Sequence, residues 1–76
     1  SNDQLAEVSL GEVSASMMYS TALFNSWVTA CGFESSDGMN EKRDEIVDYF
    51  VEQYRQMLEE NLEDYIQNFD SYMQKK

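Results

Sequence analysis

Proline and histidine are absent from this sequence of 76 residues, and glycine occurs only three times. So few turn-forming residues cannot supply the many tight turns of a β-sheet protein. Glutamate, glutamine, methionine and leucine are abundant instead, and these residues favour helices. The composition therefore predicts an all-α fold.

The absence of histidine also removes the most versatile general base and the commonest metal ligand of proteins. No serine–base arrangement and no glycine-rich phosphate loop is present. Metal centres in helical bundles combine inward glutamates with a Glu-x-x-His motif, which this sequence cannot form. We therefore expect no enzyme activity and no cofactor or metal site.

Cysteine and basic residues are scarce as well. The single Cys31 cannot form an internal disulfide and indicates a reducing compartment. Because no signal or transit peptide pattern is present, we expect a cytoplasmic location. Five basic against fifteen acidic residues give a formal charge of −10, which repels nucleic acid and anionic lipid. A basic protein partner is compatible with this charge.

The longest stretch without charge runs over residues 13–33 and predicts a central helix over about residues 10–31. Ser9 and Glu12 fit a capping box at its start, and Gly32 fits a left-handed residue after its end. Seven residues would share one face: Leu10, Val13, Met17, Phe24, Trp27, Val28 and Cys31. A second, weaker apolar face predicts that neighbours enclose this helix.

A membrane span is the competing interpretation of this stretch, because its length and lack of charge both qualify. Its serines and threonines, Asn25 and the acidic flanks Glu12 and Glu34 oppose that interpretation. We therefore expect no membrane association.

A polar connection over residues 34–40 precedes a long helix over about residues 40–74, with Asp37 or Asn40 as its cap and Lys75 and Lys76 suited to its end. A spine on this helix keeps strict 4-3 spacing: Val47, Val51, Tyr54, Leu58, Asn61, Tyr65, Asn68 and Tyr72. The apolar flanks of the spine change sides near Asn61. Either the helix bends there, or its two halves meet different partners.

The predicted helix lengths, about 33 Å and about 50 Å at 1.5 Å per residue, leave the end of the second helix uncovered by the first. Its apolar residues would form a larger patch than a monomer usually exposes. We therefore predict a homodimer. The expected interface comprises Leu58, Asn61, Leu62, Tyr65, Ile66, Asn68, Phe69, Tyr72 and Met73.

Two polar features of the long helix have alternative interpretations. Asn61 and Asn68 either fix the register of a helix pair or face a wet gap or bend. Six acids fall in one sector opposite the spine: Glu45, Asp48, Glu52, Glu59, Glu63 and Asp70. A solvated face, with Arg55 bridging Glu52 or Glu59, is the simpler interpretation, and a docking face for a basic partner is the alternative.

Three segments carry a resemblance to a known family: VSASMMY (13–19), LFNSWV (23–28) and YFVEQYRQMLEENLEDYIQNF (49–69). They resemble a family of small proteobacterial proteins defined only as a domain of unknown function. The resemblance implies a bacterial, cytoplasmic, helical protein, often with further sequence before this part. It carries over no catalytic or binding residues.

Taken together, we expect a single domain over residues 1–76 that forms an antiparallel helical hairpin with a short N-terminal segment and is completed by dimerisation. The expected function is a self-associating protein–protein interaction module. The alternatives are a helical module that binds a small molecule or metal through Trp27, Tyr54 and nearby acids, and an acidic decoy of a nucleic-acid-binding protein.

Overall fold

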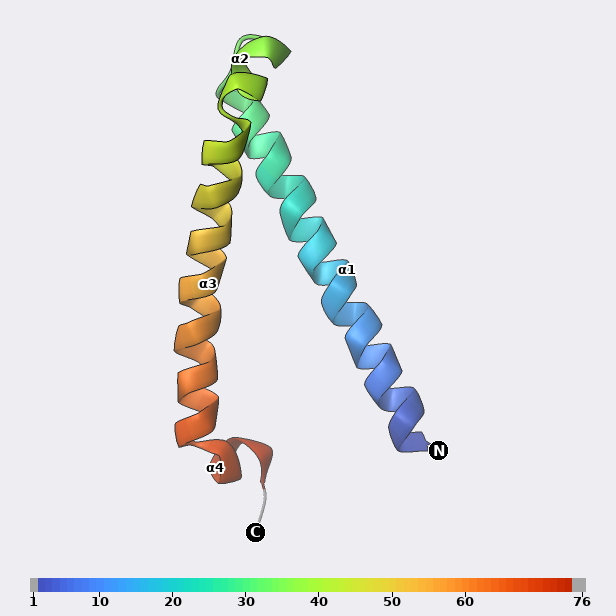
Figure 1. The fold of residues 1–76 in the computed structure, drawn as a ribbon. Coiled ribbons are helices and arrows are strands. Elements are labelled where there is room, and N and C mark those ends of the chain that lie inside the picture. The colour runs from blue at the N-terminus through green and yellow to red at the C-terminus, as the bar shows by residue number, and fades with distance from the viewer. Residues whose placement is uncertain (1, 75–76) are drawn as a thin grey trace. The chain divides into compact units, whose positions relative to one another are not determined.

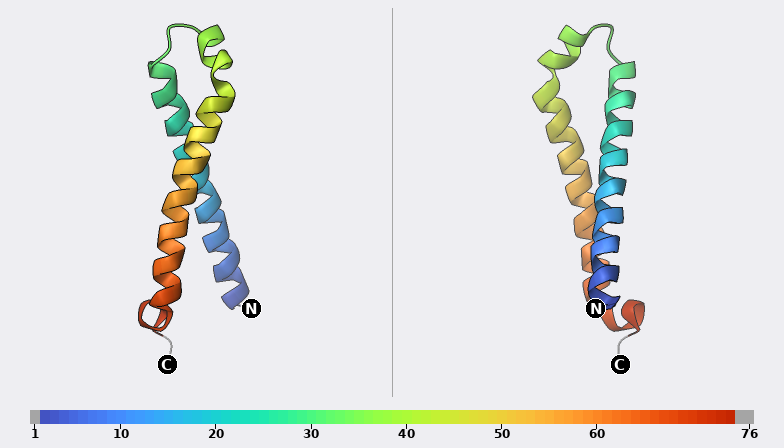
Figure 2. Two further views of the ribbon diagram at one scale, coloured as in Figure 1. Left: turned by 60° about the vertical axis from the view of Figure 1, so that its left-hand side comes forward. Right: turned by 90° about the vertical axis from the view of Figure 1, so that its right-hand side faces the viewer.

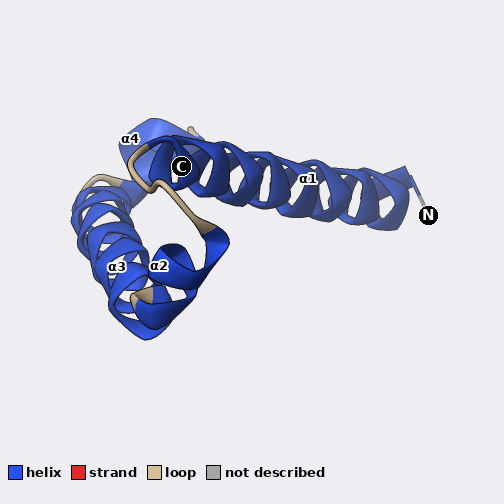
Figure 3. Cartoon of the chain, turned by 90° about the horizontal axis from the view of Figure 1, so that it is seen from above, coloured by secondary structure: helices blue, strands red, loops and turns tan. Residues whose placement is uncertain are grey.

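The computed structural model describes the backbone of residues 2–74, and the side chains of this range except those of residues 2, 3 and 5. Over these residues the chain forms four helices and no strand, which confirms the predicted all-α class (Figure 3). The chain divides into two units, residues 1–39 and residues 40–76. Each unit is described below by itself.

The first unit is dominated by one helix, α1, over Asn2–Cys31 (Figure 1). It begins before the predicted start, so the proposed capping box is wrong: Ser9 and Glu12 lie inside the helix. The reason is that no helix breaker separates Gln4 from Leu10, and a single glycine at position 11 does not stop a helix. The predicted short N-terminal segment is therefore part of α1.

The end of α1 is close to the predicted one but is built differently. Gly32 donates its N–H to the carbonyl of Thr29 at 3.0 Å, and Phe33 donates to Ala30 at 3.1 Å. No described glycine has a positive φ, so the left-handed Gly32 is wrong. The last turn tightens through bonds to the third preceding residue instead.

The connection that follows α1 is shorter than predicted, because a further helix, α2, occupies Ser36–Glu41. Its cap is Ser35, whose hydroxyl accepts a hydrogen bond from the backbone N–H of Gly38 at 3.1 Å. Asp37 and Asn40, the predicted caps, both lie within α2.

The second unit contains α3 over Arg43–Gln67 and α4 over Phe69–Met73. The predicted long helix is therefore interrupted at Asn68, where φ is −115° and ψ is 27°. This break lies one heptad after Asn61, where the sequence indicated either a bend or a change of partner. Figure 2 shows α4 turning away from the axis of α3. The expected role of Lys75 and Lys76 lies outside the described residues.

Neither unit has a hydrophobic core of its own, because none of the described side chains is buried. The least exposed apolar side chains include Phe33, Met39, Ile46 and Phe50, which are half-buried. Single helices and short helix pairs cannot enclose a side chain on all sides. The apolar faces read from the sequence are therefore present as exposed surfaces.

Candidate interaction surface

The clearest of these surfaces lies at the end of the second unit. Six apolar side chains gather there on α3 and α4: Leu62, Tyr65, Ile66, Phe69, Tyr72 and Met73. We call this set the C-terminal cluster. Their exposed fractions range from 47% for Tyr72 to 71% for Ile66. Leu58, one turn earlier on α3, is 42% exposed. The cluster is thus not covered by other residues of its own unit.

The helix break at Asn68 divides the cluster. Leu62, Tyr65 and Ile66 belong to α3, whereas Phe69, Tyr72 and Met73 belong to α4. A continuous helix would have arranged these residues in a stripe. The break instead folds the second group back toward the first.

Asp64 is the residue that holds α4 in this position. Its carboxylate accepts a hydrogen bond from the Tyr72 hydroxyl at 2.9 Å and another from the Asn68 side-chain amide at 2.9 Å. The backbone N–H of Asn68 also bonds to the Asp64 carbonyl at 3.0 Å. The rings of Tyr65 and Tyr72 lie with centroids 4.8 Å apart. We call this arrangement of Asp64, Asn68 and Tyr72 the C-terminal hook.

The hook changes the acidity of its tyrosine. The hydrogen bond to Asp64 raises the pKa of the Tyr72 phenol above its ordinary value, and the negative charge of the same carboxylate adds to the effect. Both causes favour the neutral phenol, which can donate the bond, over the phenolate, which cannot.

Asn61 and Asn68, paired in the sequence pattern, have different places in the structure. Asn61 lies within α3, and its side-chain amide donates to the carbonyl of Met57 at 2.7 Å. Asn68 lies at the break itself. For Asn68 the structure therefore shows a bend, one of the two alternatives that the sequence left open.

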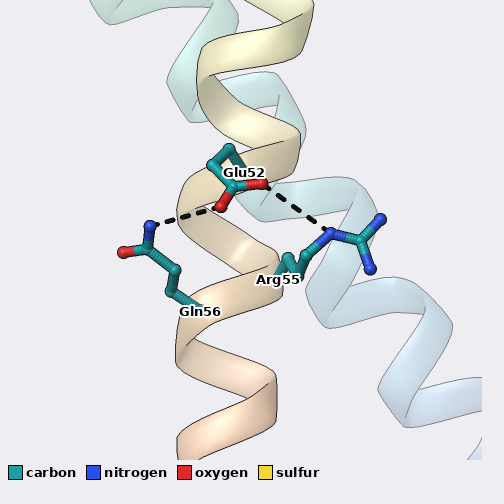
Figure 4. Close-up of polar contacts among 3 residues, drawn as sticks. All are labelled: Glu52, Arg55 and Gln56. Carbon is teal, nitrogen blue, oxygen red and sulfur yellow. Dashed lines mark hydrogen bonds and ion pairs between the residues drawn. The ribbon is translucent and has the colours of Figure 1, made fainter.

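The acidic side chains of the predicted sector are exposed, and some of them bond to side chains on neighbouring turns. The Glu52 carboxylate forms an ion pair with the guanidinium of Arg55 at 3.8 Å and accepts a hydrogen bond from the side-chain amide of Gln56 at 3.3 Å (Figure 4). The bridge from Arg55 to Glu52 is one of the two that the sequence predicted. Lys42 pairs with Glu45 at 3.5 Å. Such exposed pairs contribute little to stability.

The remaining acids of this sector are placed less uniformly than predicted. Asp48, Glu59 and Glu63 lie on α3, and Glu63 accepts a bond from the amide of Gln67 at 2.8 Å. Asp70 lies beyond the break, in the first turn of α4. It is therefore not part of the same continuous helical face.

The face predicted for α1 is exposed in the first unit. Phe24 is 61% exposed and Trp27 64%, and their ring centroids lie 5.9 Å apart. Cys31, which belongs to the same predicted face, is exposed as well. A single helix cannot cover its own apolar face, so any burial of this face has to come from elsewhere.

The second helix was predicted to be longer than the first, and this prediction is wrong. α1 has 30 residues and α3 has 25, which correspond to about 45 Å and about 38 Å. The first helix is longer because it begins at Asn2, and the second is shorter because it ends at Gln67. The case for a partner therefore depends on exposure and not on length.

Neither a metal site nor a membrane span is present among the described residues. No three of their acidic or cysteine side chains form a group that could hold a metal ion. In the same part of the chain, no helix combines the length and the apolar content that crossing a bilayer requires.

Sequence reasoning identified the apolar residues of the surface but missed the hook. Asp64 is not among the acids that the sequence pattern singles out on the long helix. The available signal was the pair Asp64 and Asn68, because aspartate and asparagine four residues apart can bond to each other and to the backbone. Nothing in the heptad pattern indicates that Tyr72 reaches back to Asp64.

Comparisons with known proteins give one result. No curated protein and no solved structure matches the chain. A family model does match, over residues 1–66, and its description is "Protein of unknown function (DUF3144)". The resemblance noted from the sequence is thereby confirmed as far as a helical domain of unknown function is concerned. Because the match covers most of the 76 residues, the chain belongs to the family described as Protein of unknown function (DUF3144).

Proposed function

We propose that this protein is a self-associating protein–protein interaction module without catalytic activity. In this proposal the helices pair as an antiparallel hairpin, and a second copy of the chain completes the fold. The observation that carries the proposal is the exposure of the C-terminal cluster, in which Ile66 is 71% and Phe69 50% exposed.

The hydrophobic effect supports a covering partner for this cluster. Burial of apolar surface contributes about 25 cal/mol per Å², so covering one large side chain stabilises a complex by about 1.5–3 kcal/mol. Contiguous exposed apolar patches on soluble proteins commonly mark protein contacts. Six such side chains on adjoining turns make a surface of this kind.

A second copy is the occupant that the sequence pattern favours. The spine of α3 keeps a 4-3 repeat from Val47 to Tyr65, and this repeat is typical of helices that pair with each other. Identical chains bring the same surface to both sides of a two-fold axis. A self-complementary seam therefore needs no other partner.

Sedimentation velocity and light scattering test the association. We expect the 8.9 kDa chain to show the mass of two chains at micromolar concentration. Ile66→Glu introduces a charge into the C-terminal cluster and should shift the protein to monomer. Gln53→Glu adds the same charge on an exposed position of α3 outside the cluster, and should leave the mass unchanged.

The association proposal is wrong if the unmodified protein sediments as a monomer over this concentration range. It is also wrong if both variants lower the mass equally, because net charge and not the cluster would then control association.

Spin labels test the hairpin independently. Glu7 precedes the end of α1 by as many residues as Gln67 follows the start of α3, so a hairpin places the two at the same height. We expect Glu7→Cys/Gln67→Cys, combined with Cys31→Ser, to give a narrow distance distribution for helix axes about 8–10 Å apart. Dilution with unlabelled protein isolates the distance within one chain. A broad distribution at long distance contradicts the hairpin.

A further inference from the structure

At the end of the second unit, the heptad spacing of the sequence predicts a continuous helix, whereas the structure has a break. In the sequence, Asn68 and Tyr72 continue the 4-3 spacing of the spine beyond Tyr65. In the structure, α3 ends at Gln67 and this spacing no longer places Tyr72 on the face of α3. The same residues are therefore compatible with two arrangements.

The hook could not exist in a continuous helix. At 1.5 Å per residue, Asp64 and Tyr72 would be about 12 Å apart along the axis, and Tyr65 and Tyr72 about 10 Å apart. The observed hydrogen bond of 2.9 Å and the ring separation of 4.8 Å thus both require the break. Forming the hook and straightening the helix exclude each other.

The two arrangements exchange one set of hydrogen bonds for another. A continuous helix would bond the N–H groups of Phe69, Asp70 and Ser71 to carbonyls four residues earlier. The hooked form has the contacts of Asp64 with Asn68 and Tyr72 in their place. At the far end, Gln74 adopts a left-handed conformation with φ of 55°, which is unfavourable for a residue with a side chain.

We propose that Asn68 is a hinge between the observed hooked form and a straight form in which α3 continues through α4. Asparagine suits this position because it tolerates non-helical backbone conformations and its side chain bonds to nearby backbone groups. In the straight form Asn68 and Tyr72 return to the spine and lengthen it by a heptad. In the hooked form the spine ends at Tyr65.

The hinge would regulate the proposed interaction surface, and only this consequence rests on the proposed function. The straight form presents the apolar residues of α4 in line with those of α3. The hooked form instead brings Tyr72 beside Tyr65, with ring centroids 4.8 Å apart. A partner that binds one arrangement better shifts the population toward it.

Hydrogen exchange read by mass spectrometry tests the hinge on the full chain at low micromolar concentration. Asp64→Ala removes the carboxylate that holds the hook. Glu60→Ala, also on α3, removes the same charge one turn earlier and serves as the control. We expect Asp64→Ala to slow exchange in the peptide that covers residues 68–72, by about fivefold for each hydrogen bond of the hook that is lost. Glu60→Ala should not change this exchange.

Tyr72→Phe provides a second variant, because it removes only the hydroxyl. We expect slower exchange in the same peptide, by a smaller factor than for Asp64→Ala. Unchanged or faster exchange in both variants would overturn the hinge. The outcome is independent of the mass measured by sedimentation: a monomeric protein can show the hinge, and a dimer can lack it.

Discussion

The two long helices of this protein differ in where they carry charged side chains. α1 has no charged side chain from Val13 to its end at Cys31, and it exposes Phe24 and Trp27. α3 exposes Leu58 and Tyr65 but also carries a solvated acidic face. Both helices are apolar on at least one side, but charged residues recur along the whole of α3, whereas in α1 the last one is Glu12.

Side-chain hydrogen bonds show the same difference. In α1, Ser26 and Thr29 bond to carbonyls of their own helix, those of Ala22 and Asn25, at 2.8 and 2.7 Å. In α3, Asn61 bonds to a carbonyl in the same way, but Glu52 and Glu63 bond to side chains one turn away. A serine or threonine hydroxyl that donates to a carbonyl of its own helix no longer needs water as its hydrogen-bond acceptor. α1 therefore resembles an internal helix in sequence, although it is exposed in its own unit.

Removal of a large side chain from α1 should have the largest effect on stability and tests whether a neighbour covers this helix. If a neighbour covers α1, Trp27→Ala should lower the free energy of unfolding by about 3–5 kcal/mol, the usual cost of emptying a packed aromatic site. Urea denaturation followed by circular dichroism measures this value. Leu58→Ala on α3 should also destabilise the protein, by about 2–5 kcal/mol, if the spine is packed.

Tyr19→Ala is the control, because Tyr19, at 72%, is the most exposed large apolar residue among the described side chains. Its removal should change stability by less than about 1 kcal/mol. Equal, small effects of Trp27→Ala and Tyr19→Ala would mean that α1 stays in water, and the contrast with α3 would then have no consequence for assembly.

Replacement of the glycine inside α1 should have a smaller effect on stability. Gly11 lies in the interior of α1, and a Cβ built there would meet no atom within 4 Å. Gly11→Ala should therefore raise the free energy of unfolding by about 0.5–1 kcal/mol, because glycine costs that much in a helix interior. Thermal denaturation monitors the gain. A loss of stability would indicate that a neighbour approaches the backbone closely at this position.

The comparison also explains which features could be predicted from the sequence. Helix type and the apolar faces follow from the spacing of residues such as Val47, Val51 and Leu58, a strong and repeated signal. Boundaries depend on single residues with weak preferences. Ser9 and Ser35 both fit a cap, and only Ser35 is one, because glutamate and alanine before Ser9 support continued helix.

The hook was beyond prediction for a different physical reason. Helix propensities near Asn68 differ by only a few tenths of a kcal/mol, so they cannot decide between a straight helix and a break. The decision depends on the contact of Tyr72 with Asp64, which is a property of the folded geometry. The sequence placed the residues of the C-terminal cluster on one continuous helix, whereas the structure divides them between α3 and α4.

Exposed ion pairs should have a still smaller effect on α3. Arg55 and Glu52 lie 3.8 Å apart with side chains 61% and 57% exposed. Arg55→Gln should lower stability by no more than about 0.5 kcal/mol, the usual value for a surface pair within a helix. Denaturation in low and high salt checks this. A loss well above that value would show that Arg55 contacts a second surface and that the acidic side of α3 is not purely solvated.

The most local effect should be the titration of Tyr72, which affects the end of α3 and leaves α1 unchanged. The hydrogen bond to Asp64 raises the pKa of Tyr72 above 10.0, so the neutral phenol is favoured in the folded chain. This stabilisation is complete below the ordinary pKa and is lost as the pH rises through the raised pKa. Ultraviolet difference titration of the protein against Tyr72→Phe isolates this tyrosine. In Asp64→Ala its pKa should fall toward the ordinary value, while Glu60→Ala should leave it raised. An unchanged pKa in Asp64→Ala would show that the hook does not hold Tyr72 in solution.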